Sequence, residues 1–125
     1  QIRFMNDEPF SIKARTKSFK YAFSGIRDFI IREHNARLHL AATVVVIVIA
    51  ILLKVNYAEA ILLTIVTGLV WICELINTAI EKVIDFITFE KLPPIKYIKD
   101  VAAAAVLVAA IVALITGCLI FIPKI

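Results

Sequence analysis

The stretch VAAAAVLVAAIVALITGCLIFI, Val101 to Ile122, decides the fold class. It carries no charged residue, and Thr116 is its one polar side chain. A transmembrane helix needs about 20 consecutive, mostly apolar residues, and a proline, here Pro123, commonly ends such a helix. The stretch therefore predicts a membrane-spanning helix and an all-α protein.

The composition of the whole chain agrees with a membrane protein. Of its 125 residues, 62% are hydrophobic, and the mean hydropathy is +0.94. Soluble domains contain about 45–50% apolar residues. One small domain cannot bury so much apolar surface in its own core, so the excess is expected to face lipid or another subunit.

Two further apolar stretches complete a pattern of three spans. Residues 60–84 are long enough to cross a bilayer, although they include several polar side chains. Residues 38–55 approach spanning length. They include His39 and Lys54 near their two ends, and these long side chains can reach the membrane interface. The predicted transmembrane helices are therefore 38–55, 60–84 and 101–122, in a single domain of residues 1–125.

A basic, amphipathic segment, at about residues 10–33, precedes the first span. Its large apolar residues recur at helical spacing and share one face: Phe19, Phe23, Ile26 and Ile30. We expect an N-terminal helix lying on an anionic membrane surface, after a loose start over residues 1–9. The hydrocarbon-like remainder of the chain argues against nucleic acid as a partner.

The basic residues predict the orientation of the chain in the membrane. Eight of them precede the first span: Arg3, Lys13, Arg15, Lys17, Lys20, Arg27, Arg32 and Arg37. The first connection has only Lys54, whereas the second has Lys82, Lys91, Lys96 and Lys99. The N-terminus and the second connection are therefore predicted to be cytoplasmic, with Pro93 and Pro94 breaking the second connection into a turn before the third span.

A stripe of polar residues in the second span is the most informative feature. Its members are Glu74, Asn77, Glu81 and Asp85. At about 100° per residue all four occupy one side of a helix, and Glu74 lies about 10 Å deeper in the membrane than Glu81. An ionisable side chain at that depth is costly, so it indicates function.

The predicted orientation brings further charged residues to the same level. Glu33 ends the surface helix just before the first span, and Lys99 and Asp100 directly precede the third. Hard divalent cations such as Mg²⁺ prefer carboxylate oxygens and leave positions for substrate phosphates. The cluster therefore predicts a Mg²⁺-nucleotide site, with Glu74 placed to take a proton from a hydroxyl that stays in the bilayer. No glycine-rich phosphate loop is present, so the site must be built without one.

Simpler interpretations remain open for several of these residues. Asp85 is also compatible with a solvated helix end, and Asp100 with a favourable charge at a helix N-terminus. His34 and His39 are typical of helix anchors at the headgroups, and Trp71 is typical of packing. A single chain with three spans is not expected to cover the acids, so we expect a homo-oligomer with sites between subunits.

The segment from Glu74 to Glu81, ELINTAIE, followed by Asp85, resembles the signature of the small prokaryotic diacylglycerol kinase and undecaprenol kinase family. Lys99-Asp100 before the alanine-rich third span is similar too, and Glu33 to His39, EHNARLH, resembles the undecaprenol kinase branch of Gram-positive type. The resemblance extends from about Phe19 to Ile122. It implies a homotrimer with shared active sites that phosphorylates a lipid hydroxyl from MgATP.

The resemblance also implies a role for each matching residue. Glu74 matches the catalytic base, and Glu33 and Glu81 match the metal-binding carboxylates. Asn77 and Lys99 match positions near the transferred phosphate. Asp85 and Asp100 match acids of the nucleotide site, and Tyr21 matches an aromatic position near the adenine. The connection from Phe86 to Ile98 departs from the enterobacterial-type diacylglycerol kinase pattern, which leaves the nucleotide base contacts open.

The sequence therefore predicts an ATP-dependent lipid kinase whose acceptor is undecaprenol, favoured by the Glu33 to His39 segment, or diacylglycerol. A proton- or cation-conducting subunit is an alternative from another class, because an acidic stripe also suits a relay. That alternative gives no reason for Glu33, Lys99 and Asp100 at the same depth. A non-catalytic membrane scaffold is the third possibility, and it predicts that Glu74→Gln alters nothing beyond stability.

Overall fold

The structure, a computed structural model, describes residues 9–125, so nearly all of the predicted loose start over residues 1–9 lies outside the described residues. The described part is all-α, as predicted. Its elements are α1 (Ile12–Arg32), α2 (His34–Leu52), α3 (Tyr57–Ile87), α4 (Pro93–Phe121) and a 3-10 turn, η1 (Ile122–Lys124).

Helix α1 carries the predicted apolar face, and within residues 9–125 most of that face is left uncovered. Ser11 caps the helix by accepting a hydrogen bond from the backbone N–H of Ala14 at 3.4 Å. Phe19 and Phe23 are both largely exposed, whereas Phe29 near the C-terminal end is buried. A helix with an uncovered apolar face and basic flanks is typical of one that lies on a membrane.

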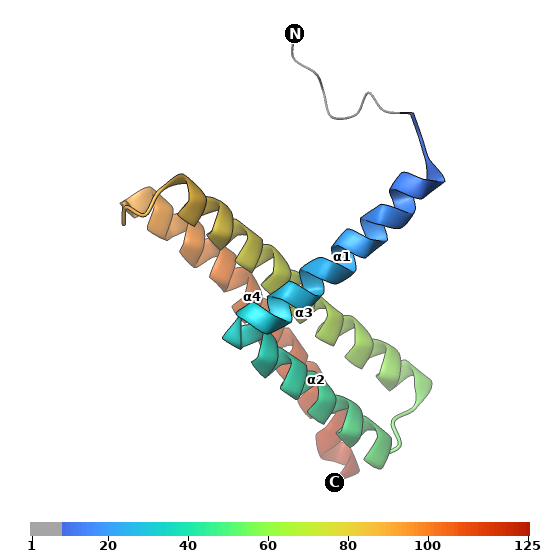
Figure 1. Ribbon diagram of the computed structural model, residues 1–125. Coiled ribbons are helices and arrows are strands. Elements are labelled where there is room, and N and C mark those ends of the chain that lie inside the picture. The colour runs from blue at the N-terminus through green and yellow to red at the C-terminus, as the bar shows by residue number, and fades with distance from the viewer. Residues whose placement is uncertain (1–8) are drawn as a thin grey trace.

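Glu33 separates α1 from α2. Its backbone is extended, with φ −105° and ψ 126°, and its N–H closes α1 on the carbonyl of Phe29. The chain therefore changes direction at one residue, and α1 leaves the bundle at a steep angle to α2 and α3 (Figure 1).

The connection between α2 and α3 is short and well defined. Lys54 has a left-handed backbone with φ 52°, and the N–H of Val55 reaches the carbonyl of Ala50 at 3.2 Å, which is a common way for a helix to end. Asn56 and Glu59 then form a reciprocal capping box that begins α3. These bonds turn the chain back within a few residues.

Helix α4 begins earlier than the sequence predicted. Pro93 and Pro94 occupy the first helical positions rather than a turn before a helix that starts at Val101. Proline is favoured at the first helical position, because its fixed φ suits a helix and no partner is needed for the missing N–H. The predicted break is wrong, and the α3–α4 connection is shortened to residues 88–92.

The longest packing contact joins α3 to α4, which run side by side in opposite directions (Figure 1). Small side chains on α4, Ala102 and Ala109, are buried and allow the two helices to approach closely. At the other end, the Lys124 ammonium lies 3.0 Å from the Glu59 carboxylate. The α3–α4 pair is therefore held along its length, whereas α2 contacts α3 over a much smaller area.

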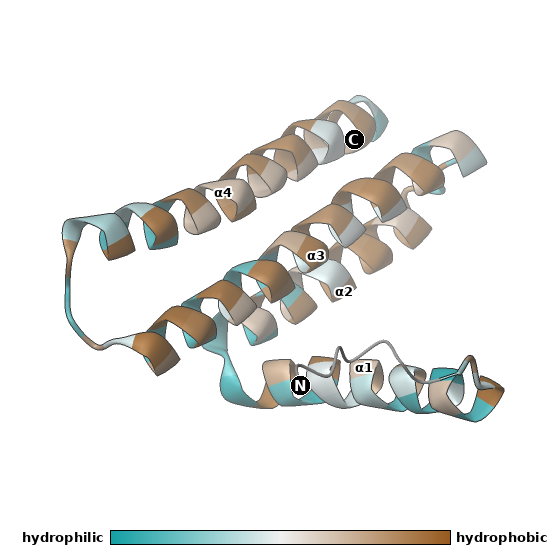
Figure 2. Ribbon diagram, turned by 90° about the horizontal axis from the view of Figure 1, so that it is seen from above, coloured by the Kyte–Doolittle hydropathy of each residue, from teal (hydrophilic) through white to brown (hydrophobic). Residues whose placement is uncertain are grey.

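Three of the helices are long and apolar enough to cross a membrane: α2, α3 and the unit formed by α4 with η1. Their outward surfaces are predominantly hydrophobic, while α1 mixes polar and apolar residues (Figure 2). Helix α3 has 31 residues, which corresponds to about 46 Å, longer than the roughly 30 Å hydrocarbon core. Part of α3 must therefore lie outside that core, and its polar C-terminal turns are the suitable part.

Candidate active site

The polar stripe of α3 lies next to the junction of α1 and α2. The Lys82 ammonium is 3.3 Å from the Glu33 carboxylate at this junction. One turn into α2, Nε2 of His39 lies 2.9 Å from Oε1 of Glu74. Helices α2 and α3, and the residue that joins α1 to α2, thus contribute charged or polar groups to one region.

Glu74 and Asn77 are the two polar side chains that are buried among the described residues, at 5% and 8% exposure. The helices of the same chain cover them. The expectation that only neighbouring subunits can cover the acids is therefore wrong for Glu74. The carboxylates of Glu33 and Asp85 remain partly exposed in the single chain.

Asn77 links the deep part of the stripe to the next carboxylate. Its Nδ2 donates to Oε1 of Glu81 at 3.4 Å, while its Oδ1 is buried and has no hydrogen-bond partner within residues 9–125. A buried acceptor without a partner is unusual and indicates a missing donor or cation. The amide oxygen is therefore free to meet a group that the chain itself does not supply.

Lys99 reaches the outer end of the stripe from α4. Its Nζ lies 2.7 Å from Oδ1 of Asp85. The next residue, Asp100, points to another side of the helix, where it pairs with Lys96 and stays mostly exposed. Adjacent residues differ by about 100° around a helix, so Lys99 and Asp100 cannot both face α3.

Two of the eight predicted site residues are not brought to this region. Asp100 is turned away, as described, and Tyr21 is 69% exposed on α1, whose N-terminal part projects from the bundle (Figure 1). Of the other six, Glu74, Asn77, Glu81 and Asp85 follow one another along α3. Lys99 pairs with Asp85 from α4, and Glu33 pairs with Lys82 of α3.

The oxygen donors in this region fit a hard divalent cation. Glu33 and Glu81 offer carboxylates, and the unpartnered Oδ1 of Asn77 lies on the same stripe as Glu81. Within residues 9–125, no three His, Cys, Asp or Glu side chains form a group that could hold a metal ion by themselves. Mg²⁺ is commonly bound through one or two carboxylates plus waters and substrate phosphates, so these residues would hold it only together with a bound nucleotide.

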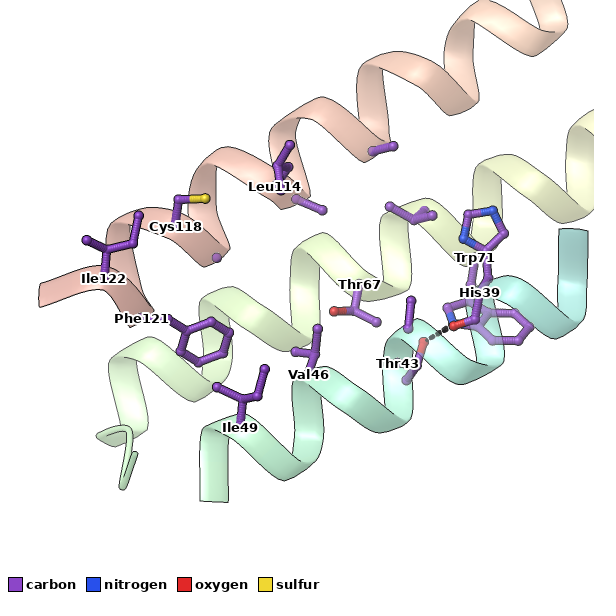
Figure 3. A pocket seen from close by; sticks show the side chains of 15 residues that line it. His39, Thr43, Val46, Ile49, Thr67, Trp71, Leu114, Cys118, Phe121 and Ile122 are labelled. Carbon is purple, nitrogen blue, oxygen red and sulfur yellow. Dashed lines mark hydrogen bonds between the residues drawn. The ribbon is translucent and has the colours of Figure 1, made fainter. Parts of the chain in front are cut away.

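An apolar cavity of about 480 Å³ extends from this region between α2, α3 and α4. His39, Thr43 and Trp71 lie at one end, and Ile49, Phe121 and Ile122 line the other (Figure 3). Because His39 also contacts Glu74, the buried carboxylate lies beside the polar end of the cavity. The arrangement could hold an apolar chain while a terminal hydroxyl meets the carboxylate.

Sequence reasoning assigned His39 to helix anchoring and did not pair it with Glu74. The contact joins α2 to α3 across 35 positions, and one-dimensional spacing does not reveal such a pairing. A signal was present, because a buried carboxylate in a membrane span requires a donor and His39 lies on the neighbouring span at a similar depth. The interpretation of Trp71 as a packing residue is confirmed: its ring lies edge-on to Phe29, at 6.2 Å between centroids.

Comparison with known proteins gives one family. Residues 20–121 match the family "Prokaryotic diacylglycerol kinase". The chain is 39% identical to "Undecaprenol kinase" of Bacillus subtilis (strain 168) over 108 residues, which cover 86% of this chain and 88% of that protein. It is 38% identical to "Diacylglycerol kinase" of Escherichia coli (strain K12), over 83% of this chain and 85% of the relative. "Diacylglycerol kinase" of Synechocystis sp. (strain ATCC 27184 / PCC 6803 / Kazusa) is also 38% identical, over 85% of this chain and 61% of the relative.

The described chain is all-α with three candidate membrane spans, and the family match adds the class of enzyme: a membrane lipid kinase. The chain belongs to the prokaryotic diacylglycerol kinase family of lipid kinases, which the sequence resemblance had indicated. It is thus a phosphotransferase, and ATP is the phosphate donor that such a kinase requires.

Proposed function

We propose that this chain transfers the γ-phosphate of MgATP to the primary hydroxyl of undecaprenol at the cytoplasmic face of the membrane. The observation that carries this proposal is the position of Glu74, a buried carboxylate beside the polar end of an apolar cavity. A long-chain alcohol can keep its chain in that cavity and present its hydroxyl to the carboxylate. A water-soluble acceptor would gain nothing from this arrangement.

The chemistry assigned to Glu74 is general base catalysis. As the acceptor oxygen bonds to the γ-phosphorus, the bond to the ADP oxygen breaks and the hydroxyl proton passes to the carboxylate. Because Glu74 is fixed in place by His39 and largely removed from water, it is oriented before the substrate arrives.

Lys99 provides the positive charge in this proposal. Its ammonium lies at the outer end of the stripe, paired with Asp85 and still partly exposed, so it can approach a phosphate from the aqueous side. In phosphoryl transfer, negative charge develops on the phosphate oxygens in the transition state. A fixed cation beside these oxygens makes one of the larger contributions to lowering the activation barrier. The family resemblance assigns the remaining roles. Nucleotide binding is assigned to Asp85, Asp100 and Tyr21, and contact with the transferred phosphate is assigned to Asn77.

Glu33 and Glu81 are the residues that would hold Mg²⁺. When bound, the cation would neutralise the phosphate oxygens of ATP. In the present arrangement Lys82 neutralises Glu33, and the Asn77 amide donates to Glu81, so both carboxylates already have positive or polar partners. Their donor atoms are the hard oxygens that this cation prefers.

The proposal of undecaprenol as the acceptor rests on the Glu33 to His39 segment, which resembles the undecaprenol kinase branch. The last residue of this segment, His39, lines the cavity. The similarity to named relatives does not decide the choice, because an undecaprenol kinase is 39% identical and diacylglycerol kinases are 38% identical. Diacylglycerol is therefore the second candidate, and the two differ in that diacylglycerol requires room for two chains.

We also infer a homotrimer with its N-terminus in the cytoplasm. The uneven distribution of Lys and Arg supports this orientation. Partial exposure of Glu33, Asp85 and Lys99 supports a neighbouring subunit that completes the site, and a projecting α1 with an exposed Tyr21 could serve that neighbour. Light scattering of the detergent-solubilised protein tests this assembly: a mass of three chains is expected, and a monomer that is fully active contradicts it.

The direct test is phosphate transfer in detergent micelles from γ-labelled ATP to undecaprenol, to diacylglycerol or to no lipid. Labelled undecaprenyl phosphate is expected to form fastest. Preferential labelling of diacylglycerol would show that diacylglycerol, not undecaprenol, is the acceptor, and the assignment as a lipid kinase would stand. Transfer to neither lipid would reject the function, and nucleotide-independent ion flux in proteoliposomes would favour the conducting subunit instead.

A further inference from the structure

His39 is the only described side chain in hydrogen-bonding contact with the Glu74 carboxylate. Its Nε2 lies 2.9 Å from Oε1, and the second oxygen, Oε2, has no hydrogen-bond partner within residues 9–125. To take a proton as a general base, the Glu74 carboxylate must be ionised, and because an ionised carboxylate can only accept, Nε2 of His39 carries the hydrogen in that state. The contact therefore fixes one oxygen of Glu74 and leaves the other available.

A second contact one turn away holds α2 in register with α3. Nε1 of Trp71 donates to Oγ1 of Thr43 at 2.8 Å, and the Thr43 hydroxyl donates to the backbone carbonyl of His39 at 2.7 Å (Figure 3). Thr43 follows His39 by four positions and Trp71 precedes Glu74 by three, so each pair lies on one face of its helix. The two contacts form neighbouring links between the same helices.

These links matter because α2 contacts α3 over a small area. Phe29 of α1 packs edge-on against Trp71 and closes the same junction from the third helix. The His39 ring therefore contacts Glu74 of α3, and its backbone lies in a junction that Thr43, Trp71 and Phe29 hold together. A residue that only anchored a helix at the headgroups would need no such support.

We infer that His39 is a positioning residue for the phosphorylation of the lipid hydroxyl. Its Nε2–H holds Oε1 of Glu74, so that Oε2 faces the hydroxyl at the polar end of the cavity. In the transfer step the hydroxyl proton goes to Oε2, the acceptor oxygen bonds to phosphorus, and ADP leaves; His39 gains and loses no proton. This inference rests on the proposed function, because it acts through Glu74.

Two amide variants test the role. In His39→Gln the side-chain N–H can reach the position of Nε2, whereas the side chain in His39→Asn is one carbon shorter and falls short. We expect His39→Asn and His39→Leu to lose about 10–100-fold in kcat, with little change in KM for MgATP, as is typical when a supporting residue is removed. His39→Gln should retain kcat within about threefold.

His34→Gln, at the exposed histidine that contacts Arg37, is the matched control and should leave kcat unchanged.

Coupling to Glu74 gives the second readout. In the Glu74→Gln background, adding His39→Leu should cause no further loss, because residues that act as a unit are not additive. If His39→Leu does not fold, as judged by its elution in detergent and MgATP binding, the Gln and Asn variants decide. A His39→Gln variant no better than His39→Asn, or an independent further loss in the double variant, would overturn the inference. With an active wild type these results leave lipid phosphorylation standing, whereas a wild type inactive on every lipid removes both proposals.

Discussion

Oε1 of Glu74 on α3 lies 2.9 Å from Nε2 of His39 on α2, and the two residues are 35 positions apart in the chain. The contact spans the smaller of the two interfaces that α3 makes with the other spans, because α3 packs chiefly against α4. The buried carboxylate thus depends on how α2 docks. A change that shifts α2 by a fraction of a turn should disturb the reaction even where it leaves α3 and α4 intact.

Thr43→Val tests this dependence without touching either member of the pair. The change removes the hydroxyl that accepts from Trp71 and leaves the indole N–H unpaired beside an apolar cavity. We expect a stability loss of about 1 kcal/mol in thermal unfolding and a severalfold decrease in kcat. Thr64→Val is the matched control, because its exposed hydroxyl also donates to the carbonyl four residues earlier, at 2.8 Å, and makes no hydrogen bond to another helix within residues 9–125. Equal effects of the two changes would contradict the role of the Thr43–Trp71 link.

Lys99→Met is expected to reduce kcat by about 100-fold while KM for the lipid changes little, since it removes a charge placed at the transferred phosphate. Steady-state kinetics with varied lipid and varied MgATP measure both quantities. Lys96→Met removes a lysine one turn earlier on α4 that pairs with Asp100 rather than with the stripe, and it should lose much less activity. An equal loss in both variants would show that general surface charge, not Lys99, carries the effect.

Glu33→Gln tests the metal assignment. Loss of one carboxylate should raise the Mg²⁺ concentration that gives half-maximal activity by about 10-fold or more, because the amide is a neutral and weaker ligand. Titration of activity with Mg²⁺ at fixed ATP gives this value. Glu90→Gln in the connection between α3 and α4 is the control and should leave it unchanged, because Glu90 is exposed and outside the polar stripe. An unchanged Mg²⁺ requirement in Glu33→Gln would remove Glu33 from the metal site.

Ala109→Leu should destabilise the α3–α4 pair. Ala109 is 3% exposed, and a larger side chain there forces the helices apart at a cost of about 1–3 kcal/mol. Ala105→Leu, at an exposed position of the same helix, should cost little. Thermal unfolding in detergent compares the two variants. Equal stability would show that close packing at Ala109 contributes nothing.

Helical periodicity and hydropathy predicted most of the fold. The uncharged run from Val101 to Ile122 and the face formed by Phe19 and Phe23 both have the expected helical structure. The start of α4 was missed because Pro93 was interpreted as a breaker, although the first helical position tolerates proline. Single-residue caps decide such boundaries, and hydropathy does not report them.

The site was predictable where one helix carries it and less so where two helices meet. The spacing of Glu74, Asn77 and Glu81 is fixed by the geometry of α3 alone, so it followed from the sequence. The pairing of His39 with Glu74 depends on the rotation of α2 about its axis, which residue spacing within α2 leaves undetermined. For the same reason Asp100 was expected beside Lys99, although consecutive residues of a helix face different directions.

The measurement that tests the central claim most directly is the turnover of Glu74→Gln with its binding of MgATP. A neutral amide of the same size cannot accept the hydroxyl proton, so kcat on the preferred lipid should fall by about 1,000-fold or more, while MgATP binds as in the wild type. Glu59→Gln, on the same helix but at its opposite end and paired with Lys124, should remain active. Wild-type turnover by a folded Glu74→Gln variant would contradict the account.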